Sequence, residues 1–110
     1  MADLDLAFTP ATELAERIRS GALSPVEAVR NSLTRIEALH SKLNCFCFVF
    51  AEEAMALAHA AERALAAGQP VGLLHGVPVA IKDLTPTKGK RTTLGSYAFE
   101  HWVPDRNATA

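Results

Sequence analysis

The stretch that decides the fold reads Leu-His-Gly-Val-Pro-Val-Ala-Ile-Lys-Asp and occupies residues 74–83. Residues 76–81 are apolar and rich in β-branched side chains, which predicts a short strand that ends at Lys82. In open α/β sheets, ligands bind at the carboxyl ends of the strands, so Lys82 is the first candidate functional residue. A lysine drawn from a buried strand loses hydration, and a neutral amine can act as a general base. The other interpretation is a solvated lysine just past a strand.

A second apolar run, CFCFVF at residues 45–50, predicts another strand whose two faces are both covered. The alanine-rich residues 52–67 between the two runs predict a helix. Strand, helix and strand in this order indicate a parallel pair with a crossover helix, and hence an α/β fold. Because two strands make a poor sheet on their own, they are expected to be the first strands of a larger mixed sheet.

Two helices are predicted before the first strand. The first begins near Thr9, which is expected to cap it with Pro10 in the first helical position, and it stops near Gly21. The second begins at Ser24, which precedes Glu27 in the spacing of a capping box. The pattern of apolar residues predicts that this helix ends between positions 39 and 42.

The chain is therefore interpreted as one N-terminal part of a single domain. It comprises a helical arm at about 9–42, a strand–helix–strand unit with the candidate lysine at about 45–83, and a loop with its following segment at 84–110. It has 110 residues, of which 49% are hydrophobic and 21% charged, which are globular proportions.

Charge and composition narrow the classes of partner and the location. The net charge is -1, so no global field favours nucleic acid or an anionic membrane surface. The acidic N-terminus does not resemble a secretory signal, and no apolar run is long enough to span a bilayer. Two cysteines make no disulfide framework, so we expect a reducing, cytoplasmic setting.

Residues 74–83 resemble the first conserved block of the amidase signature family. That block usually shows Leu-His-Gly, a small apolar residue, Pro, three apolar residues and then Lys-Asp. The helix start at residues 24–27, and residues 92–96 and 103–106 after the lysine, are also similar to this family. The resemblance covers nearly all of the chain. It implies the fold of the amidase signature family, of which this chain would hold only part of the sheet.

The resemblance implies a mechanism. Members of the family hydrolyse carboxamides through a Ser–cis-Ser–Lys triad, in which one serine attacks the carbonyl and forms an acyl-enzyme. The lysine, here Lys82, deprotonates the middle serine, and backbone amides hold the oxyanion. The resemblance implies no metal or organic cofactor.

The chain departs from the family pattern in one respect. The nucleophile and the middle serine belong to a Gly-Gly-Ser-Ser-Gly-Gly-Ser type motif, which does not occur in these 110 residues. The serines that are present lie outside any glycine-rich turn; they are Ser20, Ser24, Ser32, Ser41 and Ser96. The chain alone is therefore expected to supply only Lys82 and to be inactive.

Other chemically active side chains have structural interpretations. Cys45 and Cys47 share one face of the predicted strand, and with His40 they make an incomplete zinc set, so buried core cysteines are expected. His75 is expected to fix the turn into the strand. Asp83 either orients Lys82 or holds the following loop by accepting backbone amides. The basic residues at 88–91 are expected to be solvated.

The favoured hypothesis is the N-terminal part of an amidase acting on a small-molecule amide, with either the remainder of an amidase chain or a second copy as partner. One alternative is the amidase-family subunit of a glutamine-dependent tRNA amidotransferase. Another is a helical interaction domain without catalysis, in which Lys82 would be fully solvated.

Overall fold

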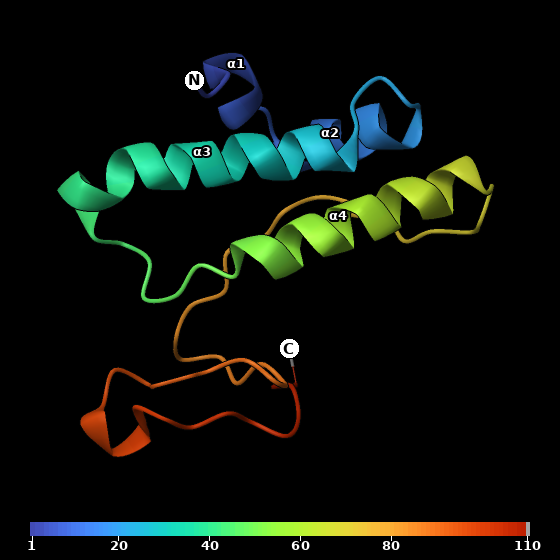
Figure 1. The fold of residues 1–110 in the computed structure, drawn as a ribbon. Coiled ribbons are helices and arrows are strands. Elements are labelled where there is room, and N and C mark those ends of the chain that lie inside the picture. Colours follow the sequence, from blue (N-terminus) through green and yellow to red (C-terminus); the bar gives the residue numbers. More distant parts are fainter. Residues whose placement is uncertain (110) are drawn as a thin grey trace. The chain divides into compact units, whose positions relative to one another are not determined.

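In a computed structural model that describes residues 1–109, the chain divides into two compact units, Met1–Pro78 and Val79–Ala110. The first unit is helical (Figure 1). The boundary between the units falls inside the ten-residue block that ends at Asp83. The single-domain interpretation of residues 1–110 stays a prediction.

Helices α1 and α2 open the first unit. Helix α1 (Leu4–Ala7) is capped by the Asp3 side chain, which accepts a hydrogen bond from the amide of Leu6. Asn31 holds this end of the chain, because its side-chain amide accepts from the Asp3 N–H at 2.7 Å and donates to the Asp3 carbonyl at 2.9 Å. Helix α2 spans Ala11–Arg19.

The start of α2 differs from the expected one. Pro10 occupies the N-cap position, and no side chain caps the helix. The predicted cap, Thr9, instead donates its hydroxyl to the carbonyl of Asp5 at 2.8 Å. The cap prediction was wrong because α1, which was not predicted, offers Thr9 a nearer partner. The predicted stop is confirmed, since Gly21 has a φ of 80° just after the helix.

Helix α3 (Pro25–Leu43) has the predicted capping box at its start. The Ser24 hydroxyl accepts from the amide of Val26 at 3.0 Å, and the Glu27 carboxylate accepts from the amide of Ser24 at 3.0 Å. Asn44 ends the helix in a left-handed conformation and donates its N–H to the carbonyl of His40 at 2.8 Å.

Helix α4 (Ala51–Ala66) confirms the alanine-rich helix, and it runs beside α3 in the opposite direction (Figure 1). Two apolar clusters hold the first unit together. Between α3 and α4, the buried residues are Val26, Val29 and Ala58. Around α2 and the start of α3, they are Ile18, Leu23 and Ala28, with Leu6, Leu14, Leu65 and Val77 packed against them.

Neither predicted strand is formed within residues 1–109. Residues 45–50 connect α3 to α4, and residues 76–81 form the end of a turn and an irregular extended segment. A strand exists only through hydrogen bonds to a neighbouring strand, and neither segment has such a neighbour among the described residues. The α/β prediction is thus supported for its helices but not for its sheet.

The second unit is a pair of loop segments that run in opposite directions. Single backbone hydrogen bonds join Gly89 to Pro104 and Thr92 to Trp102 at 3.0 Å, and a further bond joins Ala108 to Pro86 at 2.8 Å. At the tip lies the 3-10 helix η1 (Tyr97–Phe99). An antiparallel ladder would exchange two bonds at alternate residue pairs, so these segments remain loops.

Gly76→Ala should lower the free energy of unfolding of the first unit more than Gly68→Ala. Both glycines have a positive φ, 79° and 69°, which costs an alanine about 1–2 kcal/mol. A Cβ at position 76 would also lie 2.9 Å from Cγ of Pro25, whereas nothing lies within 4 Å at position 68. We expect a loss of about 2–4 kcal/mol against about 1–2 kcal/mol in urea unfolding followed by helical circular dichroism. Equal losses would contradict the close packing at Gly76.

Candidate functional site

The turn that leads to the candidate lysine is fixed on the helices of the first unit. The Nε2 atom of His75 lies 2.9 Å from the carbonyl of Ala61 in α4, within hydrogen-bond distance. The Arg19 guanidinium donates to the carbonyl of Leu73 at 3.0 Å. These contacts support the structural role predicted for His75 and hold the turn against two helices.

The segment that follows this turn is unpaired. The side chains of Val79 and Ile81 are 78% and 55% exposed, so this apolar run is left uncovered within the described part of the chain. Within the described part of the chain, the backbone of residues 79–81 makes no hydrogen bond. The segment has the composition of a strand, and its backbone N–H and C=O groups are unpaired within the described residues.

Lys82 lies at the end of this segment and is exposed. The prediction was that its amine would be largely buried at a strand end or would face an incomplete pocket; the burial arm is corrected, because no described strand covers the lysine. Its carbonyl accepts a hydrogen bond from the amide of Thr85 at 2.9 Å. The lysine amine has no hydrogen bond or ion pair with the residues described here, so it is free to meet a group supplied from elsewhere.

Asp83 closes a loop of ten residues. Its Oδ1 accepts from the amide of Thr93 at 2.8 Å, and its Oδ2 accepts the hydroxyl of the same residue. Its backbone carbonyl accepts from the amide of Leu94 at 3.0 Å. The second of the two predicted roles, holding the loop through backbone amides, is thus the one that the geometry shows directly.

Thr93 was not predicted to be the partner of Asp83. The available signal was the Thr-Thr-Leu-Gly-Ser segment at 92–96, whose small and hydroxyl-bearing residues favour local turns. The segment does turn sharply, with a positive φ at Leu94 (54°) and at Gly95 (69°). The pairing of Asp83 with a residue ten positions away depends on how the loop between them folds back, which the spacing does not state.

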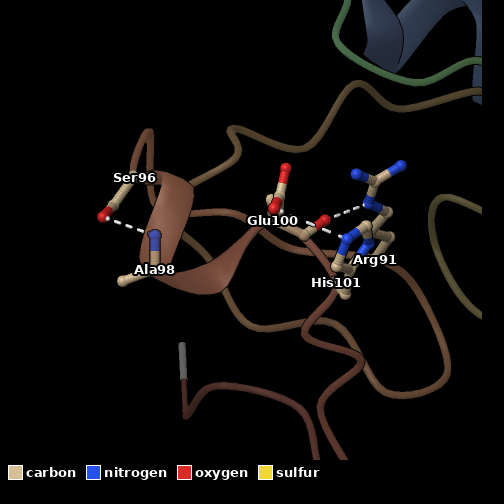
Figure 2. Close-up of polar contacts among 5 residues, drawn as sticks. All are labelled: Arg91, Ser96, Ala98, Glu100 and His101. Atoms are coloured by element: carbon tan, nitrogen blue, oxygen red, sulfur yellow. Dashed lines mark hydrogen bonds and ion pairs between the residues drawn. The ribbon is translucent and has the colours of Figure 1, made fainter.

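Arg91 and Ser96 stabilise the tip of the second unit (Figure 2). The Arg91 Nε donates to the carbonyl of Glu100, and the Ser96 hydroxyl accepts from the amide of Ala98 at 3.2 Å. The Glu100 carboxylate lies 3.5 Å from Nε2 of His101. Arg91, one of the basic residues at 88–91, thus stabilises the loop through this hydrogen bond.

The cysteine pair is not a core pair. Cys45 and Cys47 are both free and exposed, so their predicted burial is wrong, because the strand that would have carried them inward is not formed. No group of three or more metal-ligating side chains occurs in residues 1–109. None of the helices in this part of the chain is both long and apolar enough to cross a membrane.

Four of the five serines have local structural roles. Ser24 and Ser96 cap helices, and the hydroxyls of Ser20 and Ser32 donate to helix carbonyls at 3.1 Å. None of these four is brought next to Lys82 by a hydrogen bond. The candidate site in this chain therefore consists of Lys82, as the candidate base, and the loop that Asp83 closes.

The sequence of the chain is similar to those of curated proteins. The chain is 47% identical over 98 residues to a glutamyl-tRNA(Gln) amidotransferase subunit from Geobacter metallireducens, covering 89% of this chain and 20% of that protein. It is 40% identical over 105 residues to the protein of the same name from Streptomyces coelicolor, covering 96% and 21%. The chain thus spans about a fifth of the length of these curated relatives.

The chain is also similar to solved structures. A bacterial aryl acylamidase of the amidase signature family matches with a TM-score of 0.79 and 34% identity, over 86% of this chain and 20% of that one. A protein from a vestigial complex linked to the origins of an s-triazine catabolic enzyme matches with a TM-score of 0.83 and 29% identity, over 91% and 22%. The family model described as Amidase matches residues 27–110, and the chain therefore belongs to the amidase family.

Proposed function

We propose that this chain is the N-terminal part of an amidase that hydrolyses carboxamide C–N bonds through a Ser–cis-Ser–Lys triad. Lys82 supplies the proton-transfer group, and the two serines come from outside residues 1–110. The observation that carries the proposal is an amine without a partner among the described residues, at the end of the family's lysine block. A general base must form a hydrogen bond with the serine hydroxyl whose proton it accepts. An amine that is not already bound to another group of this chain can form that bond.

In this reaction, the chain contributes only the proton transfer by Lys82. The Lys82 amine accepts a proton from the middle serine, which in turn activates the nucleophile, and it returns the proton as the amine leaves. No metal or organic cofactor takes part. The substrate is a small-molecule carboxamide, and we place the reaction in the cytoplasm.

The names of the curated relatives favour a second candidate function, that of the amidase-family subunit of a glutamine-dependent tRNA amidotransferase. In that case the amide is glutamine, and the ammonia passes to an acceptor held by other subunits. A full-length enzyme carrying residues 1–110 would then release ammonia from glutamine in preference to simple carboxamides. Equal turnover of glutamine and simple amides would favour the general amidase.

Lys82→Ala in a full-length amidase that carries this segment should lower kcat by several orders of magnitude, because members of a triad act as a unit. Lys82→Arg should lose as much, since a guanidinium keeps the charge but stays protonated. Lys88→Ala, which removes another exposed lysine of the same unit, is the matched control and should leave turnover within about twofold. Retained activity in Lys82→Arg would show that charge, and not proton transfer, is what position 82 supplies.

The 110-residue chain by itself should hydrolyse no amide. A base without its nucleophile cannot form an acyl-enzyme. Ammonia release from glutamine, acetamide and benzamide should equal the buffer rate. Release above that rate, abolished by Lys82→Ala, would contradict the assignment of both serines to a region outside this chain.

The isolated chain should also self-associate. Val79 and Ile81 are exposed beside an unpaired backbone edge, and such edges pair with other chains. Light scattering should show a mass that rises with concentration above 11.8 kDa. Val79→Lys should reduce the association, whereas Leu57→Lys, at a 63% exposed position on α4, should reduce it less. A constant 11.8 kDa species across the concentration range would refute the prediction.

A further inference from the structure

We propose that Asp83 is a positioning residue for Lys82, acting with Thr93 as a clamp that fixes the lysine backbone. This inference rests on the proposed function of Lys82. Both carboxylate oxygens of Asp83 are occupied by one residue, since Thr93 donates its amide to Oδ1 at 2.8 Å and its hydroxyl to Oδ2. A carboxylate held in this way acts on its neighbour through geometry, not as a second proton acceptor.

The position of Lys82 depends on the clamp because only one side of the lysine is anchored. On the amino-terminal side, residues 79–81 make no backbone hydrogen bond within the described chain. On the other side, the Lys82 carbonyl accepts from Thr85 at 2.9 Å, and the Asp83 carbonyl accepts from Leu94 at 3.0 Å. Lys82 is thus the first residue of this segment that the second unit fixes.

The hydroxyl of Thr93 is itself directed by a second contact. The amide of Gly95 lies 3.3 Å from that oxygen and donates to it, which leaves the hydroxyl proton for Asp83. Leu94 between them has a φ of 54°, a left-handed conformation that is costly for a leucine. Such a conformation persists only where the surrounding bonds over-determine it, as the bonds of the clamp do.

The chemical consequence follows from the distance that a general base must keep. A base works only within hydrogen-bond reach of its proton, and a displacement of about 1 Å can lower the rate by about 100-fold. Loss of the clamp should therefore lower kcat while the substrate contacts, and hence KM, stay the same.

The first test uses a full-length amidase that carries residues 1–110. Asp83→Ala should lower kcat by roughly 10- to 100-fold with KM within about twofold. Thr93→Val, which deletes only the hydroxyl donor, should lower kcat less, and Thr93→Ser, which keeps the donor, should retain the activity. Thr87→Val is the matched control, because its hydroxyl donates to Thr85 in the same loop and not to Asp83. Equal kcat in Thr93→Val and Thr93→Ser, or a loss expressed only in KM, would overturn the proposal.

A double-mutant cycle separates positioning from a general effect on folding. If Asp83 acts through Lys82, adding Asp83→Ala to Lys82→Ala should leave the residual kcat unchanged. If Asp83→Ala lowers kcat by the same factor in the wild-type and in the Lys82→Ala enzyme, the positioning role is overturned while the role of Lys82 stays intact. If Lys82→Ala alone keeps full activity, the proposed function itself is wrong, and the positioning role falls with it.

Discussion

The close approach of Gly76 to the start of α3 is the constraint on which the first unit depends. A side chain at this position would meet Cγ of Pro25 at 2.9 Å and Cγ2 of Ile18 at 3.3 Å, so only a glycine lets the turn lie against α2 and α3 together. The same turn is tied to α4 through His75. One small residue thus allows three helices to converge on the segment that leads to Lys82.

Two sets of contacts flank the extended segment at 79–81. Before it, the turn is bound to helices, and Arg19 adds a hydrogen bond to the carbonyl of Leu73. After it, the Asp83–Thr93 clamp closes the loop. Between them the backbone makes no hydrogen bond among the described residues and the apolar residues 79–81 are all exposed.

The candidate site was predictable in part. The family block indicated Lys82 as the candidate, and its role stays a prediction. A loop-holding role for Asp83 was among the alternatives, because a carboxylate next to a loop commonly accepts backbone amides. The partner of Asp83 was not predictable, since Thr93 lies ten residues further along the chain and reaches it only because the intervening loop folds back. Cys45 and Cys47 show the opposite error, because their burial was inferred from a strand that is not formed.

The sequence by itself determined the start of α3, the stop of α2 and the presence of α4, because their signals are local, whereas α1 was not predicted and the predicted cap of α2 was wrong. The capping box of Ser24 and Glu27, the stop at Gly21 and the alanine-rich run of α4 each act within a few residues along the chain. Only the tertiary structure decided the state of residues 45–50 and 76–81. Apolar, β-branched segments become strands when a distant segment pairs with their backbone, and no local pattern states whether that partner is present.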